Sequence, residues 1–413
     1  MRRSTSRRAN VVFALGLTAV GLTAGYLFKR PCFPPNQRRS NYHYTHGCYT
    51  DLLPLYTRSS PPFVRAGDRP FSDGGAAYRD NNFEYPPATG LVVTAANSFV
   101  RRGDARGFVR ANAVGIALFG LSGAAALGAA TARRSRLAWY ALAPSMVAYA
   151  FHNWDLVAVG CAAIGLWAFA KRRDGLAGVA LGFGAAAKLF PGLALPALVL
   201  ARRRAGAPAG RLVACAAAAF IVPNAIVLAW AGPDAWWFPW RFQSSRLPNF
   251  ETVWFFIGRH LGGDFFAGSG YARASQAAAT LIFAGGAILL LRGEWRRERF
   301  RPVTASCSLV VLFLLTTKVF SPQYAVWLLP FFALTTIPWR GIVAFTAADL
   351  FVLAAIFGFG AHFREADRGW WLNLVEAAVV LRYAALGWLL WLSGGAEDLP
   401  GGESRSGAPA PGR

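Results

Sequence analysis

Apolar segments of about 15–22 residues, the length of a helix that crosses a bilayer, recur along nearly the whole chain of 413 residues. Charged residues make up 15% of the sequence and hydrophobic residues 55%, whereas soluble domains carry roughly 25% charged residues. This composition excludes a soluble enzyme, and it excludes disorder, which requires low hydrophobicity. The sequence therefore predicts an all-α, polytopic integral membrane protein with about 11–13 transmembrane or re-entrant helices.

The apolar blocks indicate one membrane-embedded domain with two long polar loops. We expect the domain to cover residues 1–392, with external loops at 29–85 and 231–273. Residues 393–413 combine Gly, Pro and Ser with charges and are expected to form a disordered cytoplasmic tail. Block 86–100 is short for a full crossing, so a re-entrant or strongly tilted segment stays open there. The blocks lie at 11–28, 86–100, 111–131, 138–152, 154–170, 175–188, 190–201, 211–230, 274–292, 303–317, 321–338, 341–359 and 371–392.

The basic residues form short clusters between apolar blocks and contribute to a net charge of +23. On a soluble protein such a charge would indicate nucleic acid. Clusters that separate membrane segments instead follow the positive-inside rule and mark cytoplasmic helix ends. We therefore expect no nucleic-acid partner, a multi-pass protein of the cell membrane, both termini in the cytoplasm and the two long loops outside. The clusters are Arg2/Arg3/Arg7/Arg8, Arg133/Arg134/Arg136, Lys171/Arg172/Arg173, Arg202/Arg203/Arg204 and Arg296/Arg297/Arg299.

The five cysteines contain no CxxC pattern. Cys161, Cys215 and Cys307 lie in apolar blocks and are interpreted as small buried residues. Cys32 and Cys48 share the first long loop, where they either pair in an oxidising compartment or remain two free thiols.

Polar residues that can carry chemistry gather at the predicted external helix ends, where ionisable groups are costly and usually functional. Asp51, just past the first membrane helix, can take a proton from a hydroxyl nucleophile. Its alternative role is the N-cap of a helix over residues 52–56. Glu84 and Tyr85 precede a proline pair, where a glutamate also suits the helix dipole. The turn His152–Asp155 joins two short helices, and capping is its alternative role.

Four cations lie at the same predicted face. Lys188 and Lys318 each end an apolar helix shortly before a proline, where a lysine either snorkels to the interface or binds a phosphate. Arg241 and Arg246 lie in an aromatic-rich segment that suits either an interfacial belt or a lipid phosphate.

Patterns for other chemistries do not occur in the sequence. It contains no HExxH, P-loop or GxSxG motif, no GxGxxG in a strand–helix setting and no metal-ligand spacing, which disfavours redox chemistry, nucleotide hydrolysis and zinc chemistry. Asp349, Glu376 and Arg382 fall inside apolar blocks and are interpreted as ion pairs within the helix bundle.

Six features occur in the same order as in one known family. A first membrane helix is followed by Cys48-Tyr49-Thr50-Asp51-Leu52-Leu53-Pro54-Leu55-Tyr56, Glu84-Tyr85-Pro86-Pro87, Asn153-Trp154-Asp155-Leu156, Ala186-Ala187-Lys188-Leu189-Phe190-Pro191 and Lys318-Val319-Phe320-Ser321-Pro322-Gln323-Tyr324. Over residues 10–392 the chain thus resembles glycosyltransferase family 87 of the GT-C superfamily. The resemblance implies an integral-membrane transferase that uses a polyprenyl-phosphate-linked sugar, typically mannose or arabinose, at an extracytoplasmic active site.

The resemblance places the family's aspartate base at Asp51. An acceptor hydroxyl needs such a base and a departing phosphate needs cations, so we expect an inverting single displacement of a hexose, mannose first, onto a lipid or glycan acceptor. The superfamily commonly has a pair of acids where this chain has one, so we expect no metal, and no other cofactor. The expected donor-phosphate ligands are Lys318, Lys188, Arg241 and Arg246, and the expected sugar- or acceptor-binding residues are Glu84, Tyr85, Asn153, Asp155 and Gln323.

Two other classes of protein fit a chain of this composition: a transporter or lipid-linked sugar flippase, and an assembly subunit that docks through the first loop. The expected partners of a transferase are a polyprenyl-phosphate sugar donor, a lipid or glycan acceptor and membrane lipids. A transferase should hold Asp51, Lys318 and Asp155 near one another in a cavity that opens outward. A transporter should have a central cavity that opens alternately to each side.

Overall fold

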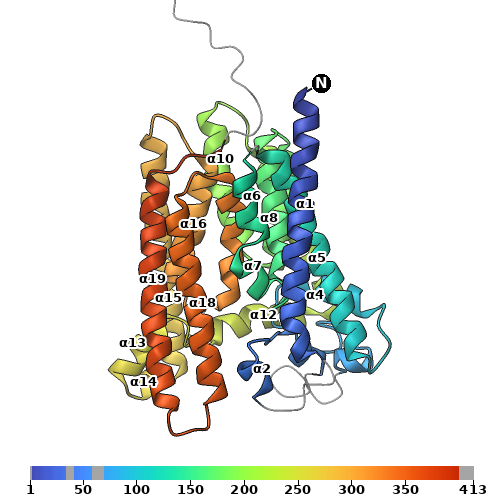
Figure 1. The fold of residues 1–413 in the computed structure, drawn as a ribbon, viewed down its shortest axis with the longest axis vertical. Coiled ribbons are helices and arrows are strands. Elements are labelled where there is room, and N and C mark those ends of the chain that lie inside the picture. The colour runs from blue at the N-terminus through green and yellow to red at the C-terminus, as the bar shows by residue number, and fades with distance from the viewer. Residues whose placement is uncertain (1, 34–40, 58–68, 132, 400–413) are drawn as a thin grey trace, which may run out of the picture.

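The computed structural model describes residues 2–33, 41–57, 69–131 and 133–399, and it is a bundle of helices that run between two ends (Figure 1). Within these ranges no strand is assigned, which confirms the all-α class. The helices are α1 (Arg2–Lys29), η1 (Arg30–Cys32), α2 (Tyr42–Thr45), α3 (Leu52–Tyr56), η3 (Phe71–Asp73), α4 (Pro87–Asn97), α5 (Ala105–Ala130), α6 (Arg134–Ala141), α7 (Pro144–Tyr149), α8 (Asp155–Ala170), α9 (Asp174–Ala187), η4 (Phe190–Ala194), α10 (Leu195–Arg204), α11 (Gly210–Ala231), α12 (Pro233–Ser245), α13 (Val253–Leu261), α14 (Asp264–Ala267), α15 (Ser269–Arg296), α16 (Pro302–Thr316), η5 (Pro322–Leu328), α17 (Leu329–Leu334), α18 (Trp339–Ala361) and α19 (Arg368–Gly394).

The apolar blocks form helices of very different length. In the described part of the chain, six helices are long and apolar enough to cross a membrane: α1, α5, α11, α15, α18 and α19. Four shorter apolar stretches lie at Asp155–Ala170, Asp174–Ala187, Pro302–Thr316 and Pro322–Leu334. The remaining blocks form smaller pieces, namely α4 for 86–100, α6 and α7 for 138–152, and η4 and α10 for 190–201. The chain is a multi-pass membrane protein.

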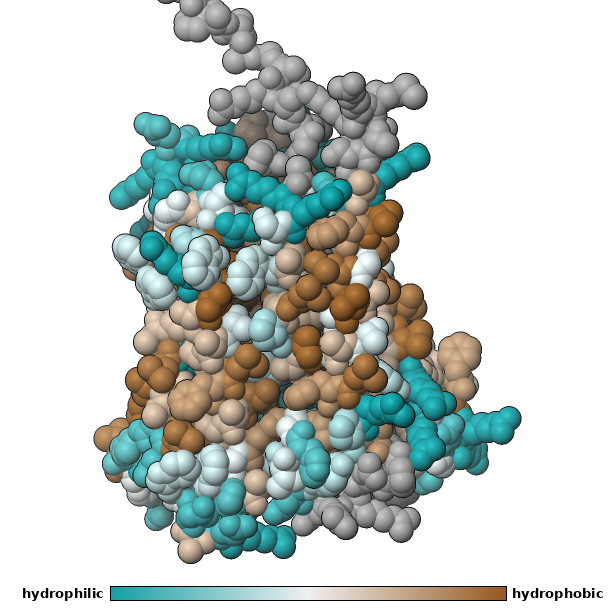
Figure 2. Space-filling model, viewed as in Figure 1, coloured by the Kyte–Doolittle hydropathy of each residue, from teal (hydrophilic) through white to brown (hydrophobic). Residues whose placement is uncertain are grey.

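The outer surface of the bundle suits a membrane. Apolar side chains cover the middle of the face in Figure 2, and hydrophilic side chains gather at its upper and lower ends. On α15, Leu281 is 72% exposed and Leu289 is 70% exposed. Exposed leucines on a helix of this length indicate contact with lipid rather than with water.

Helix α4 does not cross the bundle. Its 11 residues extend over about 16 Å, roughly half the hydrocarbon core of a bilayer. Its C-terminal end stays with the first long loop, because Asn97 Nδ2 donates to the carbonyl oxygens of Phe71 and Gly75, and the Gly103 amide donates to Ser72. Helix α5 therefore begins beside that loop and leads the chain to the opposite end of the bundle. The structure thus answers whether block 86–100 crosses the membrane, which the sequence left open.

The basic clusters share one end of the bundle, which we call the basic end (residues 7–10, 131, 133–136, 202–211, 292–301 and 335–340). Hydrogen bonds between distant segments hold this end together, and both described ends of the chain lie there. The bonds run from Arg134 to Asn10, Arg136 to Ile337, Arg204 to Trp295 and Thr336 to Glu397. This grouping is what the positive-inside rule predicts for a cytoplasmic face.

The proposed orientation is tested by single cysteines at the two ends. Arg203 lies at the basic end and Asp73 in the first long loop, and both side chains are exposed. In intact cells an impermeant thiol reagent is expected to label Asp73→Cys and to leave Arg203→Cys unlabelled until the cells are opened. The reverse pattern would place the loop, and with it the candidate site, in the cytoplasm.

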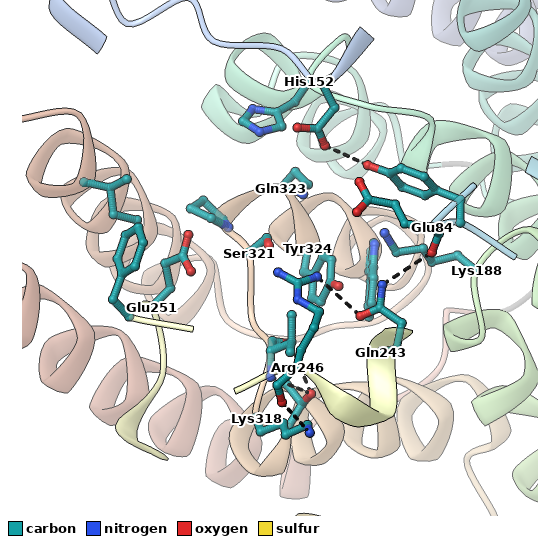
Figure 3. Close-up of a pocket in the computed structure, with 18 of the residues that line it drawn as sticks. Glu84, His152, Lys188, Gln243, Arg246, Glu251, Lys318, Ser321, Gln323 and Tyr324 are labelled. Atoms are coloured by element: carbon teal, nitrogen blue, oxygen red, sulfur yellow. Dashed lines mark hydrogen bonds between the residues drawn. The ribbon is translucent and has the colours of Figure 1, made fainter. Parts of the chain in front are cut away.

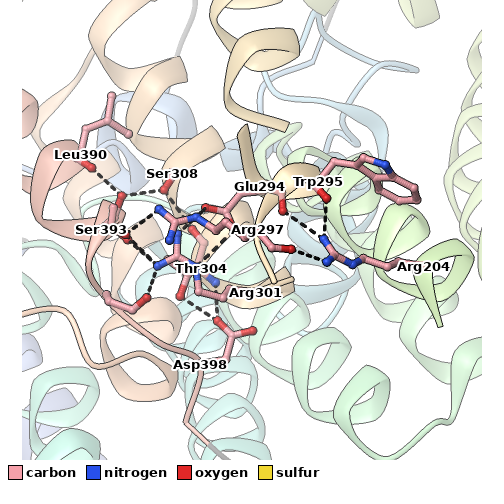
Figure 4. Close-up of polar contacts among 12 residues, drawn as sticks. Arg204, Glu294, Trp295, Arg297, Arg301, Thr304, Ser308, Leu390, Ser393 and Asp398 are labelled. Atoms are coloured by element: carbon pink, nitrogen blue, oxygen red, sulfur yellow. Dashed lines mark hydrogen bonds and ion pairs between the residues drawn. The ribbon is translucent and has the colours of Figure 1, made fainter. Parts of the chain in front are cut away.

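Residues 393–399 are held against the basic end, which differs from the disordered tail that their composition predicts. Asp398 accepts hydrogen bonds from the Val303 and Thr304 amides, at 3.0 and 2.7 Å, and so caps the start of α16 (Figure 4). A carboxylate at this position satisfies amides that no helical carbonyl can reach. Arg301, 2% exposed, pairs with Glu294 and donates to the Gly394 carbonyl. Residues 400–413 lie outside the described residues.

Close packing of α9 against α11 positions the start of the candidate site. Gly178 and Gly182 face α11, and a Cβ added to Gly182 would lie 2.1 Å from the Ala216 carbonyl oxygen. Only glycine allows the two helices to approach this closely. The C-terminal end of α9, which leads directly to Lys188, is thereby fixed in the bundle.

Candidate active site

A cavity of about 1190 Å³ lies at the end of the bundle opposite the basic end. Polar and charged residues surround it in Figure 3, while Leu193, Phe283 and Phe313 provide apolar walls. Eight of its polar lining residues come from segments far apart in the sequence: Asp51, Glu84, Tyr85, His152, Lys188, Arg246, Lys318 and Gln323. The cavity thus lies at the end of the bundle at which the sequence places the active site.

The segment that carries Asp51 is tied down on both sides. A disulfide joins Cys48 to Cys32 at the end of α1, with a Cα–Cα distance of 5.6 Å, which settles the pairing that the sequence left open. Fully buried Lys29 donates to the Tyr49 carbonyl at 2.7 Å. The Asp51 amide donates to the His152 carbonyl at 2.8 Å. These contacts hold the Asp51 backbone against the turn between α7 and α8.

The Asp51 side chain points into the cavity and does not cap a helix. Asp51 occupies the N-cap position of α3, but its side chain makes no capping hydrogen bond. Its Oδ2 instead accepts a hydrogen bond from the Tyr85 hydroxyl at 2.7 Å. The Asp51 carboxylate raises the pKa of Tyr49 well above its ordinary value, and burial adds to this shift. The carboxylate is hydrogen-bonded by the side chains of Tyr85 and Tyr49 and keeps further lone pairs with which to accept a proton.

Lys188 lies on the other side of the same tyrosine. Its Nζ is 5.1 Å from the centre of the Tyr85 ring and 4.8 Å from that of Tyr324, and it pairs with Asp155 Oδ1 at 2.8 Å. Trp327 Nε1 donates to the other Asp155 oxygen at 2.9 Å. Burial lowers the pKa of Lys188, but Asp155 and other neighbours raise it further, so the net shift is upward and the ammonium stays charged.

Lys318 lines the cavity but directs its ammonium into the protein. Nζ donates to the carbonyl oxygens of Ser244, Arg246 and Ala272, at 2.9, 2.7 and 3.0 Å. These bonds use all three N–H groups of a lysine, so Lys318 neither snorkels nor points at a ligand in this structure. It fixes the end of α12 and thereby the backbone of Arg246, which also lines the cavity.

The other predicted site residues take three positions. Glu84, Tyr85 and Gln323 line the cavity. Asn153 and Asp155 lie one contact behind the lining: Asn153 donates to the Tyr85 hydroxyl at 3.4 Å, and Asp155 holds Lys188. Arg241 is exposed and does not line the cavity.

Glu251 is a cavity residue that the sequence did not single out. It is 8% exposed and lies on the side of the cavity away from Glu84 in Figure 3. A lone acid in a loop carries no periodic signal, so only the fold reveals it. Glu84 and Glu251 bring further carboxylates to the cavity that holds Asp51. In the described ranges, the group of side chains close enough together to hold a metal ion is His362, Glu365 and Asp367, which lies outside the cavity on the connection between α18 and α19.

Arg382 braces the loops that form this wall. It is fully buried and pairs with Asp349 Oδ1 at 3.1 Å, which confirms the ion pair that the sequence predicts. Arg382 Nη2 also donates to the carbonyls of Glu251 and Phe320. Glu376 pairs instead with Arg259 and His260 of α13.

Glu251 should make stability depend on pH. Burial raises its pKa from 4.5 to about 7, although Arg382 opposes the shift. The folded protein therefore holds this proton more tightly than the unfolded chain, and the contribution of Glu251 to stability declines as pH rises from 4.5 to about 7. Glu251→Gln is expected to remove this decline, on the order of 1–3 kcal/mol, as measured by melting temperature against pH. Exposed Glu298→Gln is the matched control, and parallel pH profiles for wild type and Glu251→Gln would contradict the assignment.

With this geometry established, the comparison with protein families is decisive. Residues 83–322 match glycosyltransferase family 87, which is more than half of the chain. The protein belongs to glycosyltransferase family 87. The matched range includes Glu84, His152, Lys188, Arg246 and Lys318 of the cavity, while Asp51 lies before it.

The family 87 membership agrees with the resemblance drawn from the motifs, and the chain is a membrane glycosyltransferase. Among solved structures, the crystal structure of ArnT from Cupriavidus metallidurans bound to undecaprenyl phosphate is similar over 92% of this chain and 76% of its own, with 17% identity and a TM-score of 0.43. No curated protein matches the chain significantly.

Proposed function

We propose that this glycosyltransferase moves a hexose, mannose first, from a polyprenyl-phosphate-linked donor to a lipid or glycan acceptor on the extracytoplasmic face, with Asp51 as base. One observation supports the proposal: Tyr85 contacts both Asp51 and Lys188. Its hydroxyl donates a hydrogen bond to the Asp51 carboxylate, and its ring lies beneath the Lys188 ammonium. The candidate base Asp51 and the candidate phosphate ligand Lys188 thus lie in one cavity, separated by the side chain of Tyr85. That spacing suits an acceptor on one side of a sugar and a phosphate on the other.

The proposed reaction is a single displacement. The acceptor hydroxyl gives its proton to the Asp51 carboxylate while its oxygen forms a bond to the anomeric carbon. The bond between that carbon and the phosphate oxygen breaks on the opposite face, and the electron pair leaves with the phosphate. Inversion follows because attack and departure take place on opposite faces. Lys188 and Arg246 stabilise the charge on the leaving phosphate.

The apolar wall of the cavity suits the polyprenyl chain. Leu193, Ala279, Phe283 and Phe313 line it, and they belong to η4, α15 and α16. An isoprenoid buries its methyl and methylene groups against such side chains, while its phosphate remains at the polar part of the cavity.

The function is tested with the purified protein in lipid nanodiscs and labelled polyprenyl-phosphate-mannose. We expect the label to pass to a lipid or glycan acceptor from the source membranes, together with release of polyprenyl phosphate. A protein that consumes neither this donor nor its arabinose analogue would refute the proposed donor class.

Arg246 should contribute to donor binding, and Arg241 of the same segment should not. Loss of a hydrogen bond to a charged phosphate weakens binding about tenfold to a hundredfold, so Arg246→Gln is expected to raise the KM for donor by that factor. Arg241→Gln is the matched control, because Arg241 is exposed and lies outside the cavity lining. Equal donor KM values for the two variants would remove Arg246 from the phosphate site.

A further inference from the structure

His152 is a buried cavity residue whose ring nitrogen Nδ1 has no hydrogen-bond partner in the described protein. It is 6% exposed, lines the cavity, and its Nδ1 is buried and unpaired. The rings of Tyr49 and Tyr149 hold the imidazole, with centroids at 5.4 and 6.2 Å. The His152 backbone, in contrast, is fully engaged through its bonds to Asp51 and Tyr149. The ring is therefore fixed in position, while its Nδ1 is left without a hydrogen-bond partner in the described ranges.

Gln323 repeats this pattern on the neighbouring wall. It is also 6% exposed and lines the cavity, and its Oε1 is buried without a partner in the described ranges. Gln323 belongs to η5, which packs against both α7 and α8, the helices that flank His152. In Figure 3 both side chains lie on the side of the cavity away from Lys318.

Two unpaired buried polar groups beside a cavity are best explained by a ligand. A buried donor or acceptor without a partner is destabilising, so native proteins pair almost all of them. Burial, together with Lys29 and Lys188, lowers the pKa of His152 well below its ordinary value, so its imidazole is neutral. A neutral imidazole offers one donor and one acceptor, and a glutamine amide offers both as well. This combination matches hydroxyl groups, which also donate and accept.

We propose that His152 and Gln323 form a hydroxyl-binding subsite beside Asp51 that holds the acceptor, which therefore presents at least two hydroxyl groups, as a sugar or polyol does. The His152 carbonyl accepts a hydrogen bond from the Asp51 amide, so a backbone hydrogen bond joins the subsite directly to the base. One hydroxyl reaches Asp51 and reacts, while its neighbour binds His152 and Gln323. The proposal rests on the proposed role of Asp51 as base and goes further by naming the residues that select the acceptor.

The test uses methyl α-D-mannopyranoside as a polyol probe and 1-propanol as a probe with a single hydroxyl. Saturation-transfer NMR with the full-length protein in nanodiscs should detect the glycoside and not propanol. His152→Phe and Gln323→Leu keep side-chain volume but remove hydrogen bonds, and each should weaken glycoside binding about tenfold. His152→Gln should retain binding in part. His260→Phe, an exposed histidine of α13 outside the cavity, is the matched control and should bind normally.

A second readout separates this subsite from the donor site. With labelled polyprenyl-phosphate-mannose, His152→Phe and Gln323→Leu should raise the KM for the glycoside by a clearly larger factor than the KM for the donor. Unchanged glycoside binding in both variants, or an equal loss of donor and acceptor affinity, would overturn the subsite. If wild type binds the glycoside in a His152-dependent manner but consumes no donor, the subsite stands and the proposed transferase chemistry fails.

Discussion

Asp51→Asn is expected to lower turnover by about 10²–10⁴, the usual contribution of a general base, while the protein still folds. Asparagine keeps the size of the side chain and can still accept the Tyr85 hydrogen bond that Asp51 Oδ2 accepts at 2.7 Å. It cannot take the proton of the acceptor hydroxyl. Rates should be measured with labelled donor at saturating acceptor, beside the melting temperature of each variant.

Asp73→Asn is the control for this prediction, because Asp73 is an exposed acid of the same long loop. It should retain full turnover. If Asp51→Asn also retains it in a well-folded protein, Asp51 is not the base, and Glu84, which lines the same cavity, becomes the next carboxylate to replace.

Arg382→Leu is expected to destabilise the protein by about 3–5 kcal/mol, because it leaves the Asp349 carboxylate buried without its cation. Arg382 is 0% exposed, and the carbonyls of Glu251 and Phe320 lose their donor in the same variant. Unfolding in denaturant should show the loss, and turnover should fall too because both loops border the cavity.

Two further variants isolate the cause. The double variant Arg382→Leu with Asp349→Leu removes both charges and should recover part of the stability. Arg259→Leu breaks the more exposed pair with Glu376 and should cost less than about 1 kcal/mol. A loss as small for Arg382→Leu as for Arg259→Leu would show that the buried pair does not brace the loops.

Hydropathy predicted the class of fold, and charge predicted the end of the bundle at which each basic cluster lies. Both features could be predicted because they depend on composition averaged over a whole helix. Hydropathy also showed that 86–100 is short for a full span but left open whether it is re-entrant or strongly tilted. Only the fold shows that it forms the short helix α4. Its hydrogen bonds to the first loop, through Asn97, involve residues more than twenty positions away.

The sequence singled out several of the residues that line the cavity, but it did not single out Glu251 and did not predict the contacts that these residues make. Sequence motifs brought Asp51, Tyr85 and Lys188 to one face, and the fold places them around one cavity. A lysine at a helix end has the same sequence signal whether it binds phosphate or carbonyls, so the three carbonyl partners of Lys318 were not predictable. The contact of Asp155 with Trp327 joins residues 172 positions apart, and no local pattern encodes it.

The bond between Cys32 and Cys48 has a consequence for the biogenesis of the enzyme. Thiols meet an oxidising environment only after they leave the cytoplasm, so in the proposed orientation this bond forms once the first loop has been translocated. A chain that inserted upside down would keep both thiols reduced and the Asp51 segment without its tether. Misoriented enzyme would then be inactive and would not consume lipid-linked sugar on the wrong side of the membrane.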